Sequence, residues 1–176
     1  MKKLLVIAAI ACAAVSANAQ VYVGGSLGFW SDKQTTGSTD VKTTTINILP
    51  EIGYNISDQW AVGTVIGWEH SKVKDQDAAN AFTIAPYARY SFYRNDLVSL
   101  FIDGGVGFTS TKVGDADAVS SFNVGFKPGL SVKLSDNFSI LAHYGFLGYE
   151  SYNDDHDAFG LDLNGNSLSF GLYYSF

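Results

Sequence analysis

Uncharged and mostly apolar side chains occupy every second position along most of this chain, and this alternation restricts its possible folds more than any other feature. From residue 43 to Phe176 the even positions of seven segments follow this rule. The odd positions between them hold mostly Gly, Ser, Ala and Asn, with a few charged residues. A period of two places successive side chains on opposite faces of a β-strand. The sequence therefore predicts a sheet with one continuous apolar face.

Eight segments carry the strand pattern, and the connections between them alternate in length. Tight turns fall near Asp58, Asp96 and Asp136, whereas long polar connections fall at 31–42, 71–80, 110–119 and 150–165. This alternation is typical of an up-and-down antiparallel meander whose long loops share one end. The first segment has the opposite parity to the others. The strands are expected at about residues 20–30, 43–56, 60–70, 81–93, 97–109, 120–134, 138–149 and 166–176.

The N-terminus has the pattern of a secretory signal peptide. Lys2 and Lys3 precede an apolar run, and the small residues 17–19 form a cleavage site before Gln20. The run is shorter than the roughly 20 residues of a membrane-spanning helix. We therefore expect residues 1–19 to be cleaved and residues 20–176 to form one domain. The alternative, lipid attachment at Cys12, is less favoured because Ala9 stands where such sites usually carry leucine.

Composition excludes several classes of function. Cys12 is the only cysteine, so the exported chain can form no disulfide. The net charge of −6 becomes more negative when Lys2 and Lys3 are removed, which makes nucleic acid an improbable partner. No glycine-rich phosphate loop, nucleotide fingerprint or cysteine-based metal site is present. We expect no cofactor and no nucleic-acid partner.

Two all-β architectures can use this alternation, and they place the apolar face oppositely. A soluble barrel of the lipocalin kind turns it inward and needs a well-solvated outer face, whereas a membrane barrel turns it toward lipid. Here the polar face is rich in Gly, Ala and Ser, which suits a narrow interior. Aromatic residues also gather in two belts, near the short turns and near the long loops, as at the two membrane interfaces. The prediction is an all-β, eight-stranded antiparallel up-and-down transmembrane β-barrel.

The sequence resembles the small outer-membrane barrels of the OmpA/OmpX type. The resemblance covers the mature chain and is carried by the signal peptide, the alternating connections, "PEIGYNISDQWAVG" (50–63) and the terminal "LSFGLYYSF" (168–176). It implies a monomer in the outer membrane of a Gram-negative-type envelope, in contact with lipid and lipopolysaccharide. The terminal residues resemble the assembly signal that the barrel assembly machinery reads: Phe170, Leu172, Tyr174 and Phe176.

Four charged residues lie at a similar depth on the inward face. Glu51 and Arg89 each lie about five residues before a short turn, and Asp103 and Lys127 lie at a similar depth on other strands. An unpaired charge in a narrow interior is strongly unfavourable, so we expect all four to form one charge-balanced network. Small barrels of the family also carry such networks. The network either plugs the lumen, the favoured interpretation, or gates a narrow ion path.

The sequence gives less support for a catalytic site or a metal-binding site. His143 lies on the inward face with Ser139 and Glu150 on the same strand, but inward residues cannot easily reach a lipid substrate. On the outward face, Thr64 has the only hydroxyl suited to attack. The fourth long loop offers weak metal candidates in Asp154, Asp155 and Asp157, whose spacing matches no EF-hand. We expect no catalytic residues and a solvated acidic loop.

The function expected from these patterns is that of a non-enzymatic integral outer-membrane protein. Its barrel would anchor four surface loops that contribute to envelope integrity or adhesion. The first alternative is a narrow pore for ions or very small solutes, and the second is a lipid-modifying enzyme.

Three prolines fall inside the strand patterns, although proline cannot donate to a strand ladder. Pro50, Pro86 and Pro128 all occupy even positions eight to ten residues before a short turn. A closed barrel has no free edge on which to place them. We therefore expect at least two of the three to coincide with a bulge or an interrupted ladder.

Overall fold

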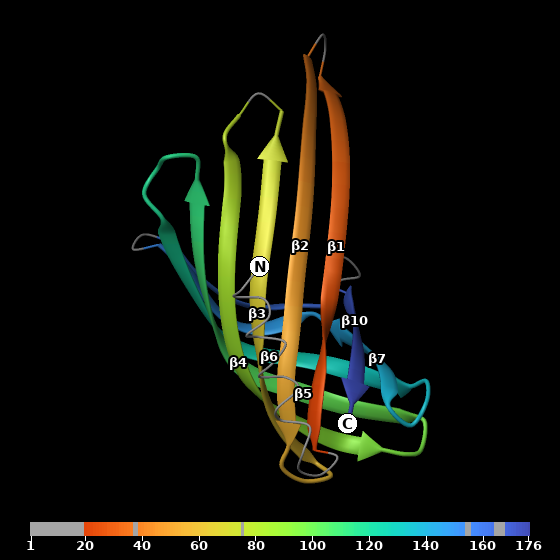
Figure 1. Ribbon diagram of the computed structural model, residues 1–176. Helices are drawn as coiled ribbons and strands as arrows, with labels where there is room; N and C mark the ends of the chain where they lie inside the picture. Colours follow the sequence, from red (N-terminus) through yellow and green to blue (C-terminus); the bar gives the residue numbers. More distant parts are fainter. Residues whose placement is uncertain (1–19, 37–38, 75, 154–155, 164–167) are drawn as a thin grey trace, which may run out of the picture.

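The computed structural model describes residues 20–36, 39–74, 76–153, 156–163 and 168–176, and the fold is all-β (Figure 1). No helix in these residues is long and apolar enough to cross a membrane. The strands in chain order are β1 (Val21–Thr36), β2 (Thr39–Asn55), β3 (Trp60–Val73), β4 (Ala78–Arg94), β5 (Val98–Val113), β6 (Val119–Lys133), β7 (Phe138–Tyr144), β8 (Phe146–Asn153), β9 (His156–Asp162) and β10 (Leu168–Ser175).

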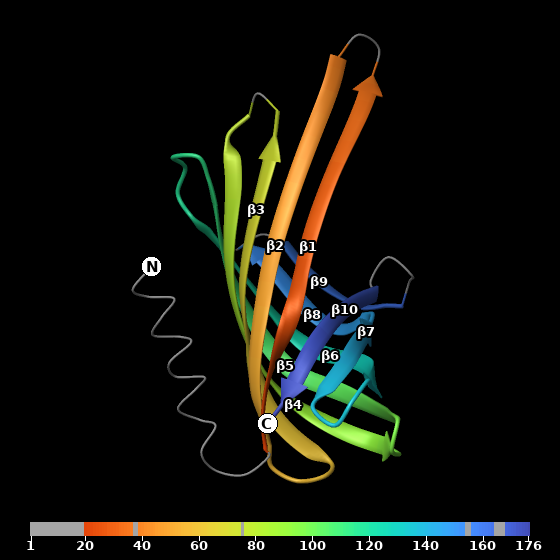
Figure 2. The ribbon, with the colours of Figure 1, turned by 45° about the vertical axis from the view of Figure 1, so that its right-hand side comes forward.

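The sheet closes on itself. Successive strands pair antiparallel from β1 to β7. β10 then pairs with β7 on one side and with β1 on the other, which closes the barrel. β7 and β8 follow one another along β6, while β9 pairs with β8 and β10 pairs with β7. β7 and β8 together form one strand of the wall, and β9 and β10 together form the next. The result is the predicted closed antiparallel barrel of eight wall strands (Figure 2).

Both ends of the barrel chain lie beside the short turns. The Phe176 amide donates to the Val21 carbonyl at 3.1 Å, and the Ser175 amide donates to the Asn137 carbonyl in the β6–β7 turn at 2.8 Å. The long hairpins project from the opposite end of the barrel (Figure 1). This arrangement is the predicted one, because an even number of wall strands returns the chain to the end at which it starts.

Even-numbered side chains point out of the barrel wall from β2 to β7, except after the register shift between Ser91 and Tyr93 in β4, where Arg94 lies opposite the inward Ser99. Ile48, Ile102 and Leu130 are all exposed, whereas Phe101, one position from Ile102, is 1% exposed and faces the lumen. Leu27 and Phe29 on β1 are also exposed, in keeping with the reversed parity of the first strand. The prediction of an outward apolar face is confirmed. The barrel therefore presents hydrocarbon-compatible side chains all around its wall.

The strands continue beyond their expected ends, because stretches predicted as long loops are paired. β1 and β2 pair as far as Thr36 and Thr39, and β8 and β9 pair within the acidic 150–165 stretch. A membrane-spanning strand needs only about 9–11 residues, whereas β2 and β4 each have 17. The excess forms paired hairpins beyond the apolar band. Polar composition in these stretches reports exposure to water and not the absence of a strand.

A bulge at Gly145 divides one wall strand into β7 and β8. Residues 144–146 lie opposite only 127–128 of β6, because His143 pairs with Gly129 and Leu147 pairs with Phe126. Gly145 has a φ of 76°, which favours glycine. The inserted residue reverses the alternation, so Leu147 is exposed and Phe146 lines a lumen cavity. The prediction that Phe146 faces outward was wrong for this reason.

All three prolines lie beside an interruption of one ladder while remaining paired on the other side, which confirms the expectation. Because proline has no N–H, it can stand where the neighbouring strand offers no regular partner. Around Pro50, the β2–β3 ladder has no pair between Ile48–Trp68 and Glu51–Val65. Around Pro86, the β4–β5 ladder has no pair between Ile84–Phe108 and Tyr87–Gly105. Pro128 of β6 faces the Gly145 bulge.

Candidate functional site

A layer of charged side chains lies inside the barrel. Glu51, Arg89 and Asp103 are 7%, 8% and 7% exposed, and they come from β2, β4 and β5. All three are odd-numbered, so the strand alternation directs them inward. Burial of charge is tolerated only where partners compensate it. The contacts between these side chains therefore decide what the layer can do.

Arg89 holds the centre of the layer. Its Nε donates to Asp103 Oδ1 at 2.7 Å and its Nη2 donates to Asp103 Oδ2 at 2.8 Å, a two-bond fork that suits a carboxylate. Nη2 also lies 3.5 Å from Glu51 Oε1. The guanidinium carbon lies 4.1 Å from the ring centroid of Phe101, which supports it from one side. Arg89 and Asp103 meet because they are directly opposite in the β4–β5 register.

Three tyrosines that the sequence analysis did not single out complete the surroundings of Glu51. The hydroxyls of Tyr87 and Tyr173 each donate to one Glu51 carboxylate oxygen. The hydroxyl of Tyr22 lies 2.5 Å from that of Tyr87. Large aromatic residues at inward positions are unusual on a face otherwise made of small residues. A search of the sequence for large aromatic residues at inward-facing strand positions would therefore have identified these tyrosines.

His143 joins the same layer from β7. Its Nε2 lies 2.8 Å from Asp103 Oδ2, and its ring meets Phe101 edge-on at 5.3 Å between centroids. We use the name lumen network for Glu51, Arg89, Asp103, His143, Tyr22, Tyr87 and Tyr173. Within the described chain no buried side-chain nitrogen or oxygen lacks a hydrogen-bond partner. The lumen network is thus a satisfied set of buried polar groups spanning β1, β2, β4, β5, β7 and β10.

Lys127 lies outside the lumen network, contrary to the prediction that it joins Glu51, Arg89 and Asp103. Its Cα is opposite that of Asp103, but Arg89 and His143 already occupy both carboxylate oxygens of Asp103. The Lys127 ammonium instead lies 5.7 Å from the ring centroid of Phe146. Among the residues that the structure describes, it forms no ion pair.

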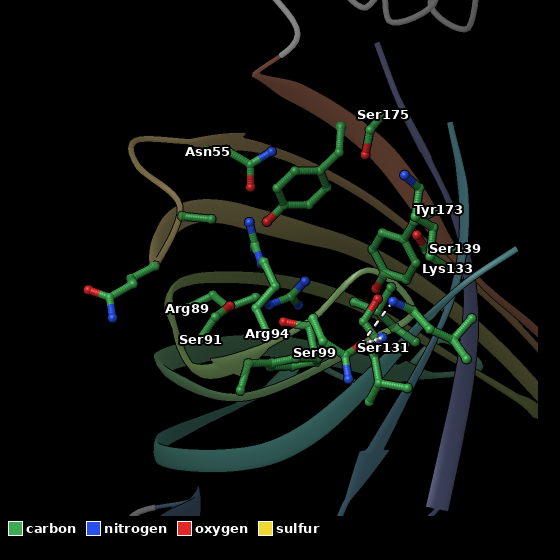
Figure 3. A pocket seen from close by; sticks show the side chains of 18 of the residues that line it. Asn55, Arg89, Ser91, Arg94, Ser99, Ser131, Lys133, Ser139, Tyr173 and Ser175 are labelled. Carbon is green, nitrogen blue, oxygen red and sulfur yellow. Dashed lines mark hydrogen bonds between the residues drawn. The ribbon is translucent and has the colours of Figure 1, made fainter. Parts of the chain in front are cut away.

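Cavities lie on both sides of the lumen network. The one toward the short turns has a volume of about 400 Å³ and has Arg89 and Tyr173 in its lining. Figure 3 shows Ser91, Ser99 and other hydroxyl-bearing side chains around it, with Arg94 and Lys133. The cavity toward the hairpins has a volume of about 240 Å³ and is lined by Glu51, Asp103, Lys127 and His143 as well as apolar residues. Side chains of one layer therefore separate two hollows.

The other candidate residues show no catalytic arrangement. In the described part of the chain, neither Ser139 nor Glu150 hydrogen-bonds His143, whose partner is Asp103. Glu150 accepts from the Tyr152 hydroxyl at 2.5 Å. The Thr64 hydroxyl donates to the backbone carbonyl of Val65 at 3.5 Å. Among these described candidates, no nucleophile is held by a base.

The acidic metal candidates are only partly described. Asp154 and Asp155 lie outside the described residues, whereas Asp157 lies on β9 and hydrogen-bonds Tyr149. Within the described ranges no group of three or more His, Cys, Asp or Glu side chains could hold a metal ion.

The terminal aromatic residues lie along β10 and its end. Phe170 and Leu172 are exposed on the outer face. Tyr174 packs edge-on against Phe138 and Phe176, with ring centroids 5.0 and 4.9 Å apart. Tyr174 and Phe176 form part of the aromatic belt near the short turns.

A comparison with protein families identifies the family. The model of the outer membrane protein beta-barrel domain matches residues 4–176. The chain belongs to this family. It is accordingly an outer-membrane β-barrel protein, in the lipid and lipopolysaccharide environment of that membrane. No curated protein matches the sequence.

Solved structures with the same fold are similar at low sequence identity. Neisserial surface protein A is 18% identical, covers 89% of this chain and 97% of its own, and has a TM-score of 0.55. The outer membrane protein Ail of Yersinia pestis is 15% identical over 90% of this chain and 100% of its own, with a TM-score of 0.46. The likeness to Neisserial surface protein A supports the eight-stranded barrel alone.

Proposed function

We propose that this outer-membrane protein is a non-enzymatic anchor that displays four surface hairpins on a barrel whose lumen is plugged. The observation that best supports a plug is the contact set of Arg89, which joins Asp103 and Glu51 across the interior. A plug needs side chains that fill the lumen and satisfy one another, because a partly satisfied polar layer would admit water. The satisfied contacts of the lumen network support the plug.

The hairpins supply the surface on which such an anchor would act. In the described residues the wall strands extend past the apolar band as pairs, as in β1 and β2, so the hairpins project as continuations of the wall. We propose that they contribute to envelope integrity or adhesion, in contact with lipopolysaccharide. We further propose that the protein is a monomer, is exported by a cleaved signal peptide (residues 1–19), and is assembled through Phe170, Leu172, Tyr174 and Phe176.

The plug is tested by single-channel recording of the refolded protein in planar bilayers. The wild-type protein should be silent, and Arg89→Ala should produce a measurable conductance because it removes the group that links Asp103 to Glu51. Ile84→Ala is the matched control, since Ile84 is an exposed residue on the outer face of the same strand. A steady conductance of the wild-type protein would refute the plug and favour the second candidate, a narrow pore. The two cavities separated by one layer of side chains favour that candidate.

The anchoring role is tested by shortening the hairpins without changing the wall. Cells with the whole protein are compared with cells whose protein lacks residues 33–42 of the first hairpin, and with cells lacking the protein. Sensitivity to bile salts reports envelope integrity, and binding to epithelial cells reports adhesion. We expect the shortened protein to lose envelope integrity, adhesion or both. It should still migrate differently in gels before and after boiling, which shows that the barrel is folded. Full retention of both by a variant with all four hairpins shortened would refute it.

A further inference from the structure

The pairing that closes the barrel ends early. β1 and β10 pair over only four positions, from Tyr22–Ser175 to Gly25–Leu172. Continuing that register would pair Leu27 with Phe170, but no pair between β1 and β10 lies beyond Gly25. We call the opening between residues 26–29 of β1 and residues 168–171 of β10 the seam. β1 and β2 leave the barrel together as a long hairpin above it (Figure 2).

The seam lies within the apolar band of the wall. On its β10 side, residues 168–171 pair with β7 residues 141–144, inside the membrane-facing section of the barrel. Leu27 is 81% exposed and Phe170 is 60% exposed. Trp30, on the inner face of β1, is 71% exposed, so this strand is uncovered on its inner face as well. Unpaired strand edges are strongly unfavourable in hydrocarbon unless something covers them or they line a cavity.

A cavity connects the seam with an unpaired cation. The 240 Å³ cavity has Gly25, Ser26, Phe170 and Gly171 in its lining at the seam, and its deeper lining includes Lys127 and Phe146. Between these ends the lining includes the inward apolar side chains of Leu49, Val65 and Ala85. Lys127 forms no ion pair within the described residues. An apolar channel that ends at a lone ammonium matches an amphiphile with a negative head.

The acidic groups near this cavity do not remove the positive end. Glu51 is held by two tyrosine hydroxyls and lies 3.5 Å from Arg89, while Asp103 is held by Arg89 and His143. Glu150 and Asp162 line an adjoining cavity that also includes Lys127 and His143. Neither of these two carboxylates lies within ion-pairing distance of Lys127. The nearest uncommitted charge at the deep end is therefore positive.

We propose that the seam admits a single-chain lipid with an anionic carboxylate head, such as a free fatty acid, from the surrounding membrane. The acyl chain would lie between β1 and β10 and in the apolar part of the cavity, and the carboxylate would bind Lys127. A volume of about 240 Å³ is below the roughly 300–1,000 Å³ usual for drug-sized ligands. It fits part of one acyl chain and not the two or more chains of a phospholipid or lipopolysaccharide. This binding is separate from the anchoring function proposed above.

Tryptophan quenching by brominated lipid tests the proposal. The protein carries Trp60→Phe and Trp68→Phe, so that Trp30 beside the seam is the only tryptophan, and it is reconstituted into phosphatidylcholine bilayers. A dibrominated fatty acid is added at low mole fraction, at a pH where its carboxyl group is ionised. The same chain as a methyl ester is the probe control. The fatty acid should quench Trp30 at an about tenfold lower mole fraction than the ester, as expected for one charge-assisted contact.

Substitutions at Lys127 separate head recognition from ordinary lipid contact. Lys127→Met should remove the advantage of the acid over the ester, and Lys127→Arg should keep it. Lys133→Met is the matched control, because Lys133 is on the same strand but pairs with Asp136 at 3.2 Å; it should change nothing. Equal quenching by acid and ester in the Trp30-only protein would overturn the proposal. Because that comparison leaves Lys127 unchanged, it decides the matter even if Lys127→Met fails to fold.

Discussion

Replacement of Arg89 by leucine should destabilise the barrel more than any change on its outer surface. The side chain is 8% exposed and makes two bonds to Asp103 in addition to its contact with Glu51. Leucine would leave two buried carboxylates without their shared cation. Breaking a buried ion pair by removing one partner costs about 3–5 kcal/mol. The upper part of this range is expected, because one residue compensates both acids.

The free energy of unfolding is measured in urea. The folded fraction at each urea concentration is read from gels in which folded and boiled protein migrate differently. Arg94→Leu is the control, because Arg94 is an exposed residue of β4; it should change stability by less than about 0.5 kcal/mol. The double variant Arg89→Leu/Asp103→Leu should be more stable than Arg89→Leu alone. Replacing both members of a buried pair by well-packed apolar residues is often neutral or stabilising, by about 1–4 kcal/mol.

Two outcomes would refute this reasoning. The first is a loss of less than about 1 kcal/mol for Arg89→Leu, which would mean that water already reaches the carboxylates and screens them. The second is a double variant whose loss equals the sum of its two single variants. Strict additivity would show that Arg89 and Asp103 are not energetically coupled, despite their 2.7 and 2.8 Å contacts.

Three further substitutions test other parts of the structure by the same unfolding assay. Phe101→Ala empties the most buried position, 1% exposed, and should cost about 3–5 kcal/mol, whereas Ile102→Ala on the outer face should cost less. Tyr173→Phe leaves one Glu51 oxygen without its donor and should cost about 1–3 kcal/mol, with Tyr174→Phe as its neutral control. Gly145→Ala places a Cβ 2.1 Å from the Asp162 carbonyl at a φ of 76° and should cost about 1–3 kcal/mol or more. Gly160→Ala, whose Cβ would meet nothing within 4 Å, should be tolerated; equal losses at both glycines would contradict the bulge.

Period-two alternation predicted the wall of the barrel because one physical condition applies at every position: lipid excludes charge from the outward face. Ile48 and Leu130, far apart in the chain, obey the same rule and are both exposed. Beyond the membrane, lipid no longer excludes charge from the outward face of the strands. Beyond it, the strand pairs of the hairpins, such as Lys33 with Lys42, no longer alternate by hydrophobicity. Their strands were therefore missed.

The interior was predictable in its charged residues but not in their partners. Parity and depth placed Arg89 beside Asp103, because directly opposite residues on neighbouring strands must meet. They could not show that His143 would occupy the second oxygen of Asp103 and displace Lys127. A carboxylate has two oxygens for which several inward donors compete. The choice among donors depends on side-chain reach across the lumen, which the alternation does not record.

The position of Lys127 follows from the backbone of its neighbouring strands. Pro128 has no N–H to donate toward β7 and β8, and on that side the opposite strand carries the extra residue of the Gly145 bulge. The extra residue turns Phe146 inward, where its ring lies 5.7 Å from the Lys127 ammonium. The ring provides a surface for a cation that Asp103 has no free oxygen to bind. The bulge thus places an aromatic ring beside the cation in the hairpin-side cavity, where an anionic ligand can still reach it.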